Sequence, residues 1–213
     1  TIGNADSLRL VKGSHIVVPR IPGAEDAYIL QNDDGRVIFV MPYETNFSLI
    51  GTTDTSFEGD PSSTKIDDDE VDYLLRTVRQ FFKQPLAAQD VVWSYSGVRP
   101  LYDSHQDNPA QVTRDYRLQL NGGKETPPLL SVLGGKVTIY RYLAEEAMEK
   151  LKPSFPGLSD PWTATVKLPG GNLGGVDFDQ YVNNLCARYP EIDAGYLRNL
   201  ARRHGDLCAQ VLG

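Results

Sequence analysis

The sequence lacks any long hydrophobic run, although 40% of its 213 residues are hydrophobic. Apolar runs are as short as Val37 to Met41, far below the ~20 residues that a membrane-spanning helix needs. Charged residues make up 23% of the chain, a proportion typical of soluble globular proteins. We therefore expect a soluble protein with a substantial core and one or two domains.

The sequence also has no excess of positive charge and few cysteines. The formal net charge is −7, from 21 basic and 28 acidic residues. No stripe of Lys and Arg alternates with aromatic residues, so we expect no nucleic-acid partner. The two cysteines, Cys186 and Cys208, lie 22 residues apart without a CxxC pair. They predict reduced thiols in a cytoplasmic protein, with no disulfide and no metal site.

Glycine patterns that bind nucleotides are absent as well. No Gly-x-Gly-x-x-Gly follows a predicted strand, and the Gly-x4-Gly-Lys-Ser/Thr loop is not found. We therefore do not expect the chain to hold a dinucleotide by itself in the manner of a Rossmann fold.

Short β-rich runs dominate the first two-thirds of the chain. They are residues 16–18, 27–30, 36–41, 48–50, 91–98, 116–120 and 129–133. The Asp34-Gly35 step between two of them predicts an antiparallel hairpin. The predicted fold class is α+β: a largely antiparallel sheet with flanking helices, followed by a small C-terminal all-α domain.

One amphipathic helix interrupts the strands over residues 67–83. Its apolar residues recur at helical spacing and predict one buried stripe: Val71, Leu74, Leu75, Val78, Phe81 and Phe82. Asp67 to Glu70 precede the stripe, where the helix dipole favours negative charge. We interpret this acidic cluster as a solvated helix cap, because it lacks the glycine and the spacing of a calcium loop.

The composition changes in the last third of the chain. The strand at 129–133 runs through Gly134-Gly135 into a predicted helix, and Pro and Gly accumulate from Pro153 to Gly171, as in a linker. The apolar faces of the predicted helices are Val137/Tyr140/Ala144/Ala147/Leu151, Phe178/Tyr181/Val182/Leu185 and Tyr196/Leu197/Leu200. We divide the chain into residues 1–152, of which about 127–152 form a strand–helix segment, and a linker with helical domain at 153–213.

Three segments combine reactive side chains with suitable backbone. His15 stands at the entrance of a strand, where an imidazole can reach a cleft and take a proton near neutral pH. Arg99 ends a run that reads as buried, with Pro100 predicted to stop the strand, so its guanidinium needs an anion. A satisfied core histidine and an internal ion pair are the alternative interpretations.

The third segment is Gly134-Gly135-Lys136-Val137-Thr138. A strand that passes through two glycines into a helix leaves backbone N–H groups unpaired at the positive end of the helix dipole. Such a terminus suits a phosphate or another electron-rich oxygen, and Lys136 adds a mobile charge. A glycine pair alone is a weak signal, because many helices begin after a glycine.

Taken together, ordered segments over nearly the whole chain resemble the FAD-dependent glycerol-3-phosphate dehydrogenases and the related glycerophosphate oxidases. The similar segments are residues 10–19, 50–55 with 59–61, 93–101, 113–116, 130–136 and 168–171. The resemblance implies that an N-terminal FAD-binding unit lies outside these residues. It also implies that residues 1–152 form the substrate-side sheet, and that their strand–helix segment returns to the FAD domain.

The resemblance further implies roles for individual residues. His15 would be the general base in the oxidation of glycerol 3-phosphate to dihydroxyacetone phosphate. It would take the proton of the hydroxyl group, and FAD would accept the hydride. Arg99, Lys136 and Thr52 would bind the substrate, and Arg99 would also stabilise developing alkoxide charge. Residues Gly134, Gly135, Lys136, Val137 and Thr138 would face the flavin's pyrimidine oxygen.

One departure from the family pattern concerns Val137-Thr138-Ile139, where Val/Leu-Thr-Thr is expected. We expect the isolated chain neither to bind FAD tightly nor to turn over. The alternatives are another flavin oxidase of the D-amino-acid-oxidase type, or a non-catalytic helical interaction module. The electron acceptor implied by the resemblance is quinone or oxygen, with a location at the inner face of the cytoplasmic membrane if the full-length enzyme is a peripheral membrane protein.

Overall fold

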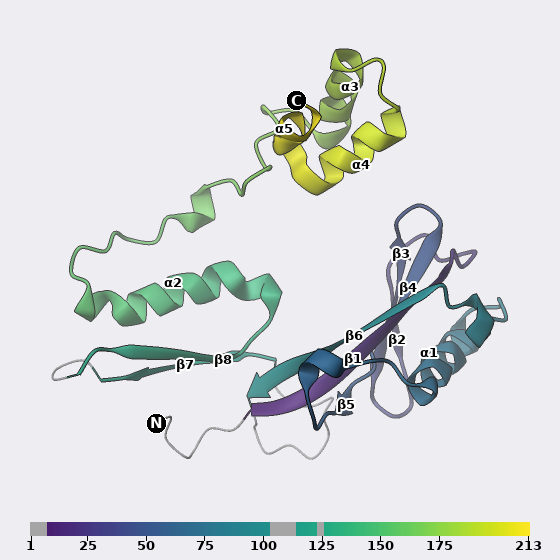
Figure 1. The fold of residues 1–213 in the computed structure, drawn as a ribbon, viewed down its shortest axis with the longest axis horizontal. Helices are drawn as coiled ribbons and strands as arrows, with labels where there is room; N and C mark the ends of the chain where they lie inside the picture. The colour runs from purple at the N-terminus through teal and green to yellow at the C-terminus, as the bar shows by residue number, and fades with distance from the viewer. Residues whose placement is uncertain (1–7, 103–113, 123–125) are drawn as a thin grey trace. The chain divides into compact units, whose positions relative to one another are not determined.

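The computed structural model describes residues 8–102, 114–122 and 126–213. Its contacts divide the chain into two compact units, residues 1–156 and 157–213. The first unit contains two antiparallel sheets and two helices, and the second is helical (Figure 1). The predicted α+β class is confirmed.

The main sheet has six strands, with the long strand β1 at its centre. The strands are β1 (Leu8–Pro19), β2 (Tyr28–Gln31), β3 (Val37–Tyr43), β4 (Phe47–Gly51), β5 (Thr55–Ser56) and β6 (Trp93–Tyr102). The order is β2-β3-β4-β1, with β5 beside the first half of β1 and β6 along its other edge. The hairpin predicted at Asp34-Gly35 joins β2 to β3.

The two sides of the main sheet differ because successive side chains of a strand point to opposite faces. On one side, which we call the α1 face, Lys12, Ser14 and Ile16 of β1 point toward helix α1 (Asp68–Phe81). On the other side, which we call the histidine face, lie Gly13 and His15. The core between the α1 face and α1 includes Ile16, Val18, Ile38, Val40, Ile50, Leu74, Leu75 and Val78.

Helix α1 begins at the predicted acidic cluster, but that cluster is not simply solvated. The carboxylate of Asp67 accepts the N–H of Glu70, and Glu70 accepts the N–H of Asp67, which forms a capping box. Glu70 is only 5% exposed because its carboxylate turns toward the sheet. The predicted buried stripe is wrong at Phe81, which is 50% exposed.

Strand β6 continues past the proline that was predicted to stop it. Its pairing with β1 extends to Leu8↔Tyr102 and places Pro100 opposite Leu10. Proline is tolerated in an edge strand, where its missing N–H can face away from the ladder, and β1 is the one partner of β6 among the described strands. For the same reason β6 is largely half-buried or exposed, not buried as predicted.

A second, two-stranded sheet follows, formed by β7 (Tyr116–Asn121) and β8 (Leu129–Gly134). Helix α2 (Tyr140–Leu151) packs against β7, and the Tyr116 hydroxyl donates a hydrogen bond to Glu146. The predicted apolar face of this helix is wrong at Val137, Tyr140 and Ala144, which are exposed, whereas the predicted positions Ala147 and Leu151 are half-buried. The other half-buried residues of the helix are Arg141, Leu143, Glu145 and Glu146.

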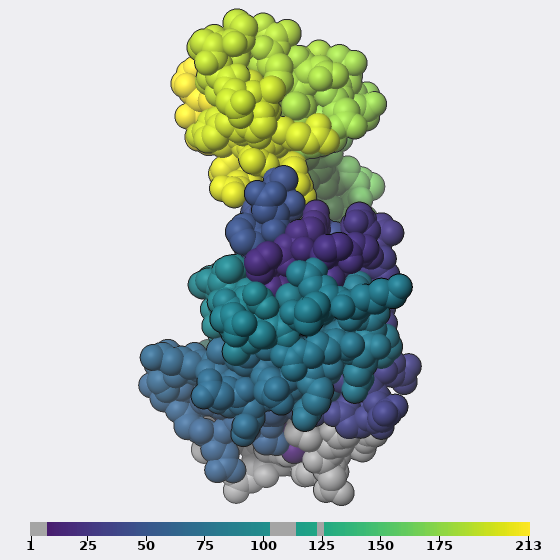
Figure 2. All heavy atoms as spheres, turned by 90° about the vertical axis from the view of Figure 1, so that its right-hand side faces the viewer, coloured from purple at the N-terminus to yellow at the C-terminus, as the bar shows by residue number. Residues whose placement is uncertain are grey.

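The second unit contains α3 (Phe178–Arg188), α4 (Ala194–His204) and α5 (Cys208–Leu212). Figure 2 shows these helices gathered into one body, drawn in yellow-green. Their core is Val182, Leu185, Leu200, Ala201 and Cys208, and Cys186 and Cys208 are free thiols. Gly170 of the preceding segment lies against the end of α4, where its carbonyl accepts the N–H of Asp206 at 3.0 Å.

Short 3₁₀ turns complete the two units: Pro61–Ser63, Ala88–Asp90, Val137–Ile139, Lys152–Ser154, Thr163–Thr165 and Gly205–Leu207. No helix in the described parts of the chain has the length and apolar character that crossing a bilayer requires.

Candidate active site

His15 lies flat on the histidine face, between its two strand neighbours. It pairs with Gly51 of β4 and with Tyr95 of β6. The Tyr95 ring stacks on the imidazole with 4.8 Å between centroids and 6° between planes. A Cβ atom at Gly51 would lie 2.2 Å from Cδ2 of His15, so the ring can occupy this position because residue 51 is glycine.

The surroundings of His15 favour its neutral form. Burial, and then the positive charge of Arg99, lower the pKa of His15 below its usual value of 6.5. Its Nδ1 atom is buried and has no hydrogen-bond partner among the described residues. The imidazole is therefore uncharged near neutral pH and can accept a proton.

Arg99 reaches back across the same face from β6. Its guanidinium lies over Gly13, where a Cβ atom would stand 2.3 Å from Nη1. Nη1 donates a hydrogen bond to Asp54 at 3.0 Å, and Nη2 to the Thr52 hydroxyl at 3.4 Å. The internal ion pair considered from the sequence is thus present, although the guanidinium also faces a cavity.

A second arginine shares the Asp54 carboxylate. Nη2 of Arg114 lies 2.7 Å from Oδ2, while Arg99 holds Oδ1. Neither Asp54 nor Arg114 was among the site residues predicted from the sequence. Both belong to segments that carry the family resemblance, 50–55 and 113–116, and that position was the available signal.

These groups line a cavity of about 750 Å³ in the first unit. Its wall contains the cationic side chains of Arg99, Arg114 and Lys136 and the carboxylate of Asp54. Arg36 also lines it, but its guanidinium pairs with Asp34 and stacks on the Tyr73 ring. Thr52 and residues 135–138 also line it, with Ile29, Val37, Phe39 and Leu101 as its apolar part. This size and lining suit a small anionic molecule.

The cavity brings together most of the predicted site residues, but not all of them. Thr52, Arg99, Lys136, Gly135, Val137 and Thr138 line it, whereas His15 and Gly134 do not. His15 lies beside the cavity, on the same sheet face as the glycine that supports the Arg99 guanidinium, and the charge of Arg99 acts on its pKa.

The glycine pair at the end of β8 turns the chain sharply. Gly134 and Gly135 have φ values of +73° and +99°, which side chains rarely adopt. The predicted passage of the strand through the glycine pair into a helix is confirmed, and the first turn of that helix is a 3₁₀ turn at Val137–Ile139. Its first hydrogen bond runs from the Ile139 N–H to the Lys136 carbonyl at 3.2 Å, so the N–H groups of Val137 and Thr138 precede the helical ladder.

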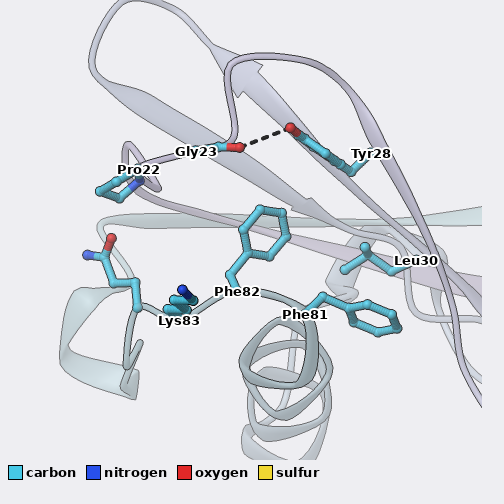
Figure 3. Close-up of a pocket in the computed structure, with 8 residues that line it drawn as sticks. Pro22, Gly23, Tyr28, Leu30, Phe81, Phe82 and Lys83 are labelled. Carbon is cyan, nitrogen blue, oxygen red and sulfur yellow. Dashed lines mark hydrogen bonds between the residues drawn. The ribbon is translucent and has the colours of Figure 1, made fainter.

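A second cavity, of about 700 Å³, lies between the start of β2 and the end of α1 (Figure 3). Aromatic and aliphatic groups dominate its lining: Pro22, Gly23, Tyr28, Leu30, Phe81, Phe82, Lys83 and Gln84. The Tyr28 hydroxyl donates to the Gly23 carbonyl at 2.9 Å. Because this wall holds no imidazole or carboxylate, the cavity beside His15 is the candidate active site.

Comparison with known proteins shows the family of the chain. Residues 2–141 match the family model of the FAD dependent oxidoreductases, DAO. The chain belongs to this family, whose cofactor is FAD.

Two curated proteins resemble this chain over nearly its whole length. The chain is 48% identical to the aerobic glycerol-3-phosphate dehydrogenase of Escherichia coli strain K12, over 97% of this chain and 41% of that protein. It is 44% identical to the D-erythritol 1-phosphate dehydrogenase of Brucella abortus, over 93% of this chain and 39% of the relative. The chain thus spans about two-fifths of the length of these relatives.

A solved structure shares the same fold. The glycerol-3-phosphate dehydrogenase from Bacillus halodurans, complexed with FAD, superposes with a TM-score of 0.79 at 27% identity. The match covers 98% of this chain and 40% of that one.

Proposed function

We propose that this chain is the substrate-side and C-terminal part of an FAD-dependent enzyme that oxidises sn-glycerol 3-phosphate to dihydroxyacetone phosphate. The observation that carries the proposal is a cavity lined by the cationic side chains of Arg99, Arg114 and Lys136, beside a neutral imidazole. Residues 1–152 supply the substrate side, and residues 153–213 form the linker and the C-terminal helical domain.

The phosphate binds to Arg99, Lys136 and Thr52, with Arg114 as an additional partner. Guanidinium groups hold phosphate oxygens through charge-assisted hydrogen bonds. Asp54 orients Arg99 and Arg114 by holding one nitrogen of each, which leaves their remaining N–H groups for the ligand. Because Lys136 lines the same wall as Arg99, a phosphate suits the cavity better than the amino-acid carboxylate of a D-amino-acid oxidase.

His15 removes the proton of the C2 hydroxyl group. The stacked Tyr95 ring and the space above Gly51 fix the plane of the imidazole, so little orientational freedom is lost in the reaction. The Arg99 guanidinium, next to this ring, stabilises the negative charge that develops on the substrate oxygen. Bound FAD supplies the hydride acceptor.

The backbone at Gly134–Thr138 fits one edge of the flavin. The N–H groups of Val137 and Thr138 precede the first hydrogen bond of the turn and can donate to a carbonyl oxygen of the pyrimidine ring. Further electron transfer goes to quinone or oxygen, with peripheral membrane contact in the quinone case.

Substrate selectivity of the full-length FAD-bound enzyme tests the proposal. We expect glycerol 3-phosphate to be oxidised and glycerol, which lacks the phosphate, to be a far poorer substrate by kcat/KM. D-Erythritol 1-phosphate is the informative second substrate, because one relative is named for it. Equal kcat/KM for glycerol and glycerol 3-phosphate would contradict a phosphate-binding cavity.

A further inference from the structure

A buried polar cluster lies directly behind the candidate active site, on the α1 face of the main sheet. Its members are Lys12, Ser14, Thr53, Glu70 and Ser96. Ser14 and Thr53 are essentially inaccessible, and Glu70 is 5% exposed. Burying a carboxylate is costly unless its oxygens are paired, so the partners of Glu70 decide whether it can lie here.

The Glu70 carboxylate is paired at both oxygens. Oε1 accepts hydrogen bonds from the hydroxyls of Thr53 at 2.7 Å and Ser14 at 3.0 Å. Oε2 lies 2.8 Å from Nζ of Lys12 and accepts the N–H of Asp67 at 3.2 Å. One side chain of α1 thereby binds Ser14 of β1, Thr53 of the segment between β4 and β5, and the start of its own helix.

The residues that Glu70 holds are the immediate neighbours of the proposed machinery. Ser14 precedes His15 in β1, and Thr53 lies between Thr52 and Asp54. The two segments are also tied to each other, because the Ser14 N–H donates to the Thr53 hydroxyl at 2.9 Å and the Thr53 N–H donates to the Ser14 carbonyl at 3.3 Å. A shift of the carboxylate therefore moves the base and the phosphate-binding hydroxyl together.

Helix capping alone does not account for this geometry. Within the capping box, the Glu70 side chain makes only the bond to the Asp67 N–H, which an exposed glutamate can make at the helix surface. Here the carboxylate also reaches the sheet and takes both hydroxyl protons. We propose that Glu70 is a positioning residue that fixes His15 and Thr52 from behind the sheet. This inference rests on the function proposed above.

Variants of the full-length FAD-bound enzyme test the inference. In Glu70→Gln, the amide oxygen must face Lys12 and the Asp67 N–H, because these groups can only donate. The N–H₂ group then faces the hydroxyls of Thr53 and Ser14, which lose the acceptor that they share. We expect kcat/KM for glycerol 3-phosphate to fall by about 10²-fold, the order reported for an approximately 1 Å displacement of catalytic groups. Thr53→Val should lower it in the same direction, while Thr53→Ser, which keeps the hydroxyl, should restore it.

Asp67→Ala is the matched control. Asp67 shares the capping box with Glu70 and also pairs with Lys12 at 3.0 Å, but no described contact joins it to Ser14 or Thr53. We expect this variant to unfold at a lower temperature and to keep wild-type kcat/KM well below that temperature. An equal loss of activity in Asp67→Ala would reduce the role of Glu70 to stability and overturn the inference.

A crystal structure of Glu70→Gln gives a readout that does not depend on turnover. We expect His15 to leave its stack on Tyr95 and Thr52 to move away from Arg99. Unmoved side chains at both positions would overturn the positioning role even if glycerol 3-phosphate is the substrate. A wild-type enzyme that does not oxidise glycerol 3-phosphate would instead refute the proposed function, with the structural comparison still deciding the role of Glu70.

Discussion

The two faces of the main sheet are built from the same strands but serve different ends. On the α1 face, branched apolar side chains such as Ile16 and Ile50 are buried in the core against α1. On the histidine face, glycines stand at the matching positions, and the space that they leave is taken by His15 and Arg99. A strand can therefore supply stability on one side and reactive groups on the other, because its side chains alternate.

The largest effect should follow from removing the base on the histidine face. In the full-length enzyme we expect His15→Ala to lower kcat by about 10²–10⁴-fold, the usual contribution of a general base. The midpoint of urea unfolding should change little, since His15 is only half-buried. Steady-state kinetics and urea titration check the two parts, and retention of wild-type kcat would remove His15 from the mechanism.

Truncating a core side chain on the α1 face should lower the stability of the protein and leave its activity almost unchanged. Leu74 is fully buried against the sheet, and its replacement by Ala should cost about 2–5 kcal/mol of unfolding free energy. The kcat of the folded variant should stay near the wild-type value. Urea unfolding measures the first quantity, and an assay below the unfolding transition measures the second.

Three glycines of the histidine face allow a finer test, because a Cβ atom added at each one would meet a different neighbour. A Cβ atom at Gly51 would strike His15, one at Gly13 would strike the Arg99 guanidinium, and one at Gly97 would meet nothing within 4 Å. We expect Gly51→Ala to lower kcat and Gly13→Ala to raise KM, each by about 10²-fold as displaced groups lose alignment.

Gly97→Ala is the control for both, since it adds the same methyl group to the same face without a contact. Wild-type kinetics in Gly97→Ala, together with impaired Gly51→Ala and Gly13→Ala, would confirm that the glycines act through their neighbours. Uniform behaviour of all three variants would contradict this explanation.

The smallest predicted effect concerns pH. Burial, and then the Arg99 charge, lower the pKa of His15, so the active neutral form persists to a pH below 6.5. The profile of log kcat/KM should bend downward only below that pH, with Arg99→Gln moving the bend to higher pH. The unfolded chain binds the proton more readily, so the contribution of His15 makes folding less favourable as pH falls from 6.5 to the lowered pKa, with no further loss below it.

Much of this comparison could be predicted from local sequence patterns. Helical spacing located α1, the Asp-Gly step located the hairpin, and the family resemblance placed Thr52, Arg99 and Lys136 in segments that the structure brings to one cavity. The roles of these residues remain predictions. His15 was expected in the same cavity but lies beside it.

The sequence-based predictions fail where contacts between distant parts of the chain determine the position of a residue. Glu70 has the sequence context of a surface cap, and only the hydroxyls of Ser14 and Thr53, far away in the sequence, draw it into the interior. Pro100 normally ends a strand, but pairing along the edge of β1 accommodates it. Asp54 lies in a segment that carries the family resemblance, but the two arginines that share its carboxylate come from distant parts of the chain, so its place in the site depends on tertiary contacts.

A crystal structure of the full-length FAD-bound enzyme with dihydroxyacetone phosphate tests the central claim most directly. The account predicts that the phosphate contacts Arg99 and Lys136, and that the oxygen on C2 lies within hydrogen-bonding distance of the His15 imidazole. A ligand bound elsewhere, or a phosphate in this cavity with C2 turned away from His15, would contradict it.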